Sequence, residues 1–197
     1  MDKANLCRMM AGLLYPIDND MLEMLQTGKI YRYFSQYFNG IDLTALDNYT
    51  GTIESNAALY RDCFETSDIC LSESTFKKWT DDPDYKVGIS ESVGLLMGDC
   101  SLHMLELYKT YAIDIPDEFR SQPDHLALEL EFLSNLYDNY SDIEVSQFIN
   151  DHLLWVSDLI MRCVKNNVDV IYLTVLEIIN SFIIDEKNRL RQVEHII

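Results

Sequence analysis

The proline at position 123 most constrains how this chain can fold. Pro123 has no backbone N–H donor and a fixed φ, and it biases Gln122 toward extended geometry, so no α-helix is expected to cross this point. Directly after it, large apolar side chains recur at helical spacing, at positions 126, 130, 133 and 137, with 128, 132 and 136 beside them. An apolar face this wide is typical of a buried helix. We therefore predict a hinge followed by a helix over residues 124–139.

Asp124 stands where this helix is expected to begin, and two local roles are open to it. Its carboxylate can cap the free backbone N–H groups of the first turn, or it can be the acidic member of a capping box that Ser121 opens. These roles exclude each other, and the sequence does not decide between them. If the helix begins here, His125 and Glu129 lie four residues apart on one face, where the carboxylate can orient the imidazole.

The rest of the chain also favours helices. Helical spacing or helix-start signals recur at residues 4–14, 19–25, 30–38, 53–64, a short stretch within 72–84, 90–97, 101–111, 142–165 and 168–186. A strand is the alternative for residues 30–38, because aromatic residues also favour sheets. No alternation of strands with helices is visible, and 168–186 is too long for a normal strand. The predicted fold class is all-α, with a tail over 187–197 that we expect to fray.

We expect one domain over residues 1–197, built from two lobes. The N-terminal lobe is 1–113, the hinge is 114–124 and the C-terminal lobe is 125–197. The run Asp114-Ile115-Pro116-Asp117 supports a break at the start of the hinge, and we expect the hinge to be exposed and open to a peptide. Such a linker permits closure within one chain or exchange between two chains, so a monomer and a hinge-swapped dimer both stay open.

Charge and cysteine content narrow the classes of partner and compartment. Fifteen basic against 33 acidic residues give a formal charge of −18, which disfavours nucleic acid and anionic membranes and suits a basic partner. Solubility alone is the competing explanation for the acid excess.

Five cysteines without a C-x-x-C pair indicate reduced thiols. No secretory signal and no uninterrupted apolar span of about 18 residues is visible, so we predict a soluble, cytoplasmic protein.

Sequence motifs for catalysis, metals and nucleotides are absent. The chain contains no G-x-x-x-x-G-K-[ST], no G-x-G-x-x-G, no H-E-x-x-H and no G-x-S-x-G, and its four histidines lie far apart in sequence. We therefore predict no metal and no cofactor, and no motif supports even weak nucleotide binding. His152 and Trp155, spaced i, i+3, are expected in the core. Tyr60, Cys63 and Phe64 are expected to pack in the core rather than to line a groove.

Three segments resemble the TorD/DmsD/NarJ family of redox-enzyme maturation chaperones. Pro123-Asp124-His125-Leu126, with the Glu129-Leu130-Glu131-Phe132-Leu133 that follows, is similar to that family's E-x-P-D-H-L-x-x-E-L-x-F-L signature. Glu91-Ser92-Val93 with Gly98-Asp99 resembles its helix before the hinge, and His152-Leu153-Leu154-Trp155 resembles its H-L-x-x-W. The resemblance covers about residues 53 to 186.

The resemblance implies an all-helical cytoplasmic chaperone that is not an enzyme. Such a protein binds the twin-arginine leader and apo-form of a molybdopterin-dependent oxidoreductase subunit, assists cofactor insertion and prevents premature export. An acidic, aromatic-rich surface suits a leader with paired arginines and an apolar stretch, and Asp124 is a natural acceptor for arginine. The leader-binding residues that we predict are Pro123, Asp124, His125, Glu129, Tyr60, Phe64, His152 and Trp155.

Two other functions stay open. One is a nucleotide-binding or hydrolytic enzyme that uses Asp124, His125 and Glu129. The other is an acidic protein-interaction module that mimics nucleic acid. The sequence does not identify the client enzyme.

Overall fold

The computed structural model describes residues 2–47, 49–84 and 87–194, with the backbone alone for 192–194. Within these ranges the regular elements are α-helices and short 3-10 and π-helical turns, accompanied by two isolated β-bridges. The predicted all-α fold is therefore confirmed. The strand alternative for residues 30–38 is wrong, because α3 (Lys29–Phe34) begins this segment.

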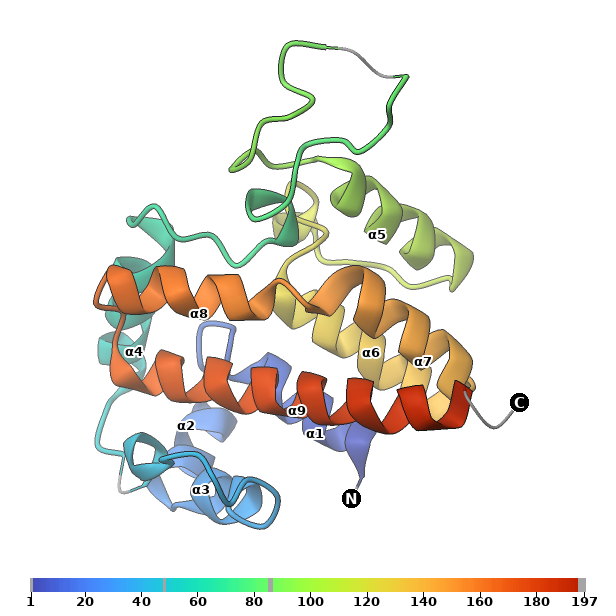
Figure 1. Ribbon diagram of the computed structural model, residues 1–197. Helices are drawn as coiled ribbons and strands as arrows, with labels where there is room; N and C mark the ends of the chain where they lie inside the picture. The colour runs from blue at the N-terminus through green and yellow to red at the C-terminus, as the bar shows by residue number, and fades with distance from the viewer. Residues whose placement is uncertain (1, 48, 85–86, 195–197) are drawn as a thin grey trace.

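The helices of the first half of the chain are short, and those of the second half form the larger part of the core (Figure 1). The other α-helices are α1 (Lys3–Gly12), α2 (Asn19–Gln26), α4 (Ile53–Tyr60), α5 (Asp99–Thr110), α6 (Leu126–Asn139), α7 (Asp142–Phe148), α8 (Val156–Lys165) and α9 (Val170–Glu194). The 3-10 turns are η1 (Thr44–Leu46), η3 (Glu73–Thr75) and η4 (Asp117–Phe119), and the π-helical turns are η2 (Arg61–Glu65) and η5 (Ile149–Leu153).

The first helix of the chain packs on the helix that follows the hinge. α1 makes its main contact with α6, while α8 packs on α9 and α7 contacts both α6 and α9. In Figure 1, α5 and a long loop extend from one end of this bundle, and α2 and α3 lie at the opposite side. One hydrophobic cluster includes side chains from both sides of the hinge, such as Leu6 and Leu133. The division into two lobes stays a prediction.

Residues 90–97 do not form the predicted helix. Their backbone groups pair with a distant segment: the Trp79 amide donates to the Ser92 carbonyl, and the Thr80 amide donates to the Ser90 carbonyl. Gly94 and Met97 have φ values of +93° and +60°, which a right-handed helix does not allow. Pairing between remote segments therefore replaces the local helical hydrogen bonds here.

The single helix predicted over 142–165 is interrupted, and the tail predicted to fray is helical as far as Glu194, while residues 195–197 lie outside the described part of the chain. α7 passes into the π-turn η5, and the chain turns at Leu154 and Trp155 before α8 begins. α9 continues to Glu194. Near its end, the Arg189 guanidinium donates to both Asp142 carboxylate oxygens, at 2.8 and 3.0 Å, which ties α9 to α7. Among the described residues, no helix combines the length and apolarity needed to cross a membrane.

Candidate functional site

The segment that enters α6 is buried, so the expectation of an exposed hinge is wrong at this end. Its backbone pairs with the chain just before η3: the Glu73 amide donates to the Asp124 carbonyl at 3.0 Å, and the Leu126 amide donates to the Leu71 carbonyl at 2.8 Å. Ser72 and His125 form an antiparallel bridge between these two hydrogen bonds. The hinge is therefore fixed by a segment about fifty residues earlier in the sequence.

Asp124 has neither of the two local roles that the sequence leaves open. Its side chain is fully buried, and its Oδ2 accepts a hydrogen bond from the Ser74 backbone N–H at 2.6 Å. The N-cap of α6 is His125, whose Nδ1 accepts the Ala127 amide at 3.2 Å. Asp124 thus joins the start of α6 to η3, which is a tertiary contact that helix-start rules do not describe.

His125 faces a cavity rather than Glu129. Its imidazole stacks on the Tyr15 ring, with centroids 6.2 Å apart, and meets the Phe119 ring edge-on at 5.0 Å. Burial lowers the pKa of His125 to about 4, because the charged imidazolium loses its hydration there. The prediction that Glu129 orients this imidazole is wrong, because no hydrogen bond joins the two side chains and Glu129 turns to other partners.

This cavity, of about 820 Å³, lies between the end of α1, the π-turn η2, η4 and the start of α6. The sequence-predicted residues Tyr60, Phe64 and His125 line it. Tyr60 and Phe64 are buried, as predicted, yet they form a wall of this cavity. Further lining side chains that sequence reasoning missed are Tyr15, Phe119, Glu65, Glu118 and Glu131. Tyr15 precedes Pro16, where the sequence predicts only the end of a helix. Phe119 lies within the hinge 114–124, where it predicts only a linker.

Carboxylates and aromatic rings therefore share one concave surface. Glu65, Glu118 and Glu131 are exposed at this cavity, and each can accept hydrogen bonds from a cation. Partial desolvation raises the pKa of Glu131, and its interaction with Tyr15 opposes the shift. No lysine or arginine is among the residues that line the cavity. The arrangement can bind a ligand that combines positive charge with apolar or aromatic groups.

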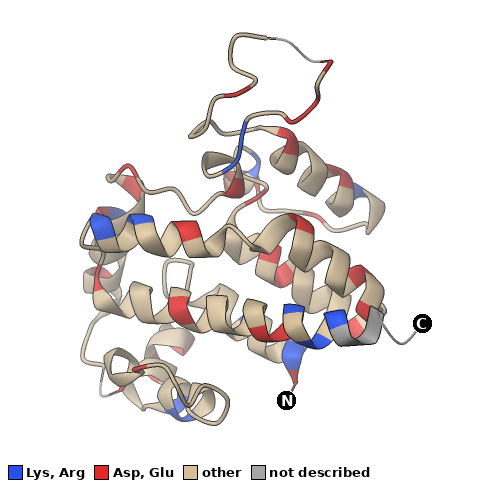
Figure 2. Cartoon of the chain, in the orientation of Figure 1, with Lys and Arg blue, Asp and Glu red and all other residues tan. Residues whose placement is uncertain are grey.

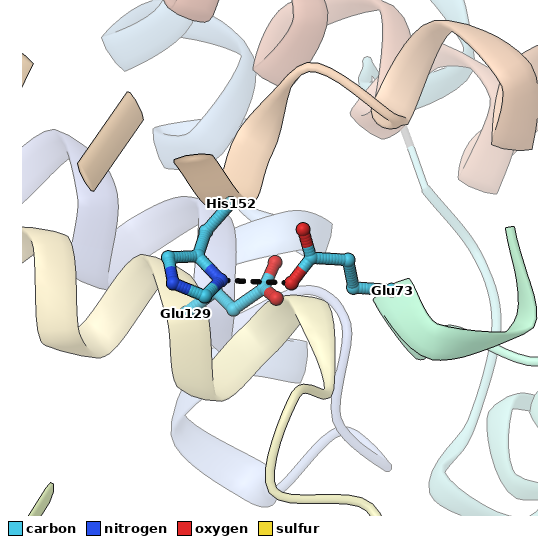
Figure 3. A group of neighbouring side chains, drawn as sticks. All are labelled: Glu73, Glu129 and His152. Carbon is cyan, nitrogen blue, oxygen red and sulfur yellow. Dashed lines mark hydrogen bonds and ion pairs between the residues drawn. The ribbon is translucent and has the colours of Figure 1, made fainter. Parts of the chain in front are cut away.

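Three other predicted site residues, Glu129, His152 and Trp155, meet in a separate buried cluster. The Trp155 indole N–H donates to Glu129 Oε2 at 3.2 Å. His152 Nδ1 lies 2.8 Å from Glu73 Oε2, beside Glu129 (Figure 3). His152 Nε2 lies 2.8 Å from His103 Nδ1, so the fold brings together two histidines that are far apart in sequence. The prediction that His152 and Trp155 are core residues is correct.

Glu73 is the member of this cluster that sequence reasoning missed. It follows an irregular stretch, its residue is fully buried, and the Lys77 ammonium forms an ion pair with its Oε1. Burial raises the pKa of Glu129, and the neighbouring carboxylates of Glu73 and Asp124 raise it further. Ligand atoms of Glu73, Glu129 and His152 lie within 4.8 Å of one another, so these three side chains are able to hold a metal ion.

Comparisons with known proteins cover this part of the chain. Residues 50–161 match a family model described as "Nitrate reductase delta subunit". Three curated relatives, each named "Chaperone protein TorD" and each from a strain of Vibrio cholerae serotype O1, are 28% identical over 107 residues. These matches cover 48% of this chain and 49% of each relative, so the chain spans about half the length of the curated relatives it matches. No solved structure matches the chain significantly.

Proposed function

The chain belongs to the family described as the nitrate reductase delta subunit, as its hinge motif predicted, and from that premise we propose that it is a non-enzymatic cytoplasmic chaperone. Its ligand is the twin-arginine leader and apo-form of a molybdopterin-dependent oxidoreductase subunit. By holding that subunit, the chaperone assists cofactor insertion and prevents premature export. The names of the curated relatives support the chaperone role.

The cavity beside His125 is the observation that carries this proposal. A twin-arginine leader presents guanidinium groups next to an apolar stretch, and the cavity offers carboxylates next to aromatic rings. Arginine pairs with a carboxylate through two parallel N–H donors and stacks on aromatic faces, so this lining suits arginine better than lysine. We place the leader contacts at Glu131 and Glu118, with Tyr15, Phe119 and Phe64 as the apolar wall.

The other predicted leader-binding residues have an indirect part in this proposal. Pro123, Asp124, Glu129, His152 and Trp155 are buried, so a peptide bound in the cavity does not reach them. The Tyr108 hydroxyl donates to the Pro123 carbonyl at 2.9 Å, and Asp124 is bonded to Ser74. The Asp124 contact holds the hinge against η3 and the Tyr108 contact holds it against α5, so both support the wall that carries His125.

Calorimetric titration with a synthetic twin-arginine leader tests the proposal. We expect Glu131→Gln and Glu118→Gln each to weaken binding about tenfold, because each loses a charge-assisted hydrogen bond. Both side chains are exposed, so the fold should remain intact. Replacing the two arginines of the peptide by lysines should also weaken binding.

Glu177→Gln is the matched control, because Glu177 is an exposed carboxylate on α9 that does not line this cavity. It removes the same charge from the molecule. Equal affinity for the three variants and the wild type would exclude the cavity as the leader site. A loss of affinity of the same size for all three would show that only total charge matters.

A further inference from the structure

The buried cluster of Glu73, Glu129 and His152 has the properties of an ion site, independently of the function proposed above. The three residues come from η3, α6 and η5, so the fold brings together segments that are far apart in sequence (Figure 3). Each is at most 2% exposed. Buried carboxylates without a compensating cation are costly, because they lose hydration and repel one another.

The charge in this region is not balanced by the lysine nearby. Glu73, Glu129 and Asp124 are fully buried acids, and ligand atoms of Glu73 and Glu129 lie within 4.8 Å of each other. Lys77 forms an ion pair with Glu73 Oε1, and among the described residues no ion pair reaches Glu129 or Asp124. Glu129 Oε1 has no hydrogen-bond partner although its residue is fully buried. A divalent cation beside this oxygen would satisfy it and offset the acid excess.

The surrounding hydrogen bonds already orient the three side chains for coordination. In the tautomer in which His103 Nδ1 accepts the Nε2–H of His152, His152 Nδ1 carries a lone pair, and a metal there would replace its present contact with Glu73 Oε2. The Trp155 indole holds Glu129 Oε2, and Lys77 holds Glu73 Oε1. The donors that a metal would take are His152 Nδ1 and Glu73 Oε2, which now contact each other at 2.8 Å, and Glu129 Oε1, which has no partner.

We propose that Glu73, Glu129 and His152 bind one divalent transition-metal ion, with Zn²⁺ as the best match to one imidazole and two carboxylates. With metal–ligand bonds of about 2.0–2.1 Å, tetrahedral donors stand about 3.3 Å apart. His152 Nδ1 and Glu73 Oε2 are 2.8 Å apart, so a small separation of these side chains admits the ion. The bound ion would link η3 and η5 to α6, the helix that follows the hinge.

Metal uptake by the purified full-length protein tests this inference. After removal of any tag and of bound metal with a chelator, Zn²⁺ is titrated in competition with a chromophoric chelator. We expect one ion per chain, a Kd below about 1 µM and a higher melting temperature with Zn²⁺. Mg²⁺ should produce no such shift, because it prefers an octahedral oxygen site.

Variants distinguish this site from adventitious binding. We expect Glu129→Gln and His152→Gln to weaken Zn²⁺ binding at least 100-fold, and His103→Gln to weaken it about tenfold through the orientation of His152. Cys100→Ser and Glu177→Gln are controls that should leave the affinity unchanged. Circular dichroism of each variant without metal shows whether it folds. Absence of one-to-one uptake would overturn the proposal. So would uptake that Glu129→Gln and His152→Gln leave unchanged, or that Cys100→Ser abolishes.

Discussion

At the scale of single residues, His125 makes three different contacts where the hinge meets α6. It caps α6, it bridges to Ser72, and its ring forms part of the cavity beside Tyr15 and Phe119. The bridge is made by the backbone, whereas the cap and the ring contacts use the neutral imidazole, whose pKa burial lowers to about 4. Nδ1 is the hydrogen-bond acceptor of the N-cap, so protonation of Nδ1 would remove the hydrogen bond from the Ala127 amide.

The pKa of His125 predicts a loss of stability in mild acid. In the unfolded chain this imidazole has a pKa of about 6.5, so below that pH the unfolded chain binds a proton that the folded chain does not bind until about pH 4. Stability from this group is complete above pH 6.5 and is lost as the pH falls. We expect this imidazole alone to contribute about 2 kcal/mol less to the unfolding free energy at pH 5 than at pH 7.5, which urea denaturation of the protein and of a variant without the imidazole measures.

His125→Asn isolates this contribution, because asparagine is a good N-cap that does not titrate. The carboxylates that share the cavity, Glu65, Glu118 and Glu131, are present in both proteins, so their effects cancel in the comparison. We expect the loss between pH 7.5 and pH 5 to be about 2 kcal/mol smaller in the variant. Parallel pH profiles for the two proteins would contradict the assignment.

Asp124 shows what local helix-start signals in a sequence can and cannot predict. The position of the helix start was predicted within two residues, because Pro123 and the leucine spacing are local signals. The partner of the Asp124 carboxylate is the Ser74 amide, fifty positions earlier in the sequence. Only the tertiary fold brings these two groups together. The same limitation applies to Glu73, whose burial beside His152 has no local signal in the sequence.

Loss of the Asp124 carboxylate should therefore cost more than a lost cap. Asp124→Ala leaves the Ser74 N–H without its partner in a buried position, and we expect the unfolding free energy to fall by about 2 kcal/mol. Asp117→Ala is the control, because Asp117 is an exposed acid in η4 that pairs with exposed Arg120. Equal effects in urea denaturation would show that the buried contact contributes nothing beyond a surface ion pair.

At the scale of elements, α6 contacts three other elements of the fold. α1 lies along it, and α7 and η5 contact it. Leu133 in its middle is fully buried, so Leu133→Ala leaves a cavity among several elements. We expect a loss of about 3 kcal/mol in unfolding free energy. Ile143→Ala in α7, a side chain that is 54% exposed, should change it by less than about 0.5 kcal/mol.

Helices with a continuous apolar face were predictable, and interruptions were not. The apolar spacing of residues 124–139 and 168–186 corresponds to α6 and α9. The π-turn η5 divides the run 142–165, although its residues keep a helical pattern. Segment 90–97 has apolar residues at plausible spacing, yet its backbone pairs with 78–80. Hydrogen bonds between separate segments replaced the helix at 90–97 and fixed the hinge that carries His125, and neither pairing has a local signal in the sequence.

At the scale of the whole molecule, the excess of acid is spread over many elements (Figure 2). The formal charge of −18 creates a negative potential beyond any one site. Such a field accelerates encounters with a basic peptide, whereas contacts in the cavity decide how long the peptide stays. The two effects can be separated by their dependence on salt.

We expect salt to slow association with a twin-arginine peptide more than it changes dissociation. Raising NaCl from 20 to 500 mM shortens the Debye length from about 20 Å to about 4 Å, so long-range attraction is screened. Stopped-flow fluorescence with a labelled peptide should show the association rate falling about tenfold or more and the dissociation rate changing less. A peptide with both arginines replaced by glutamine should show a weaker salt dependence. If the two association rates respond equally to salt, the paired arginines are not the groups that the acidic surface attracts.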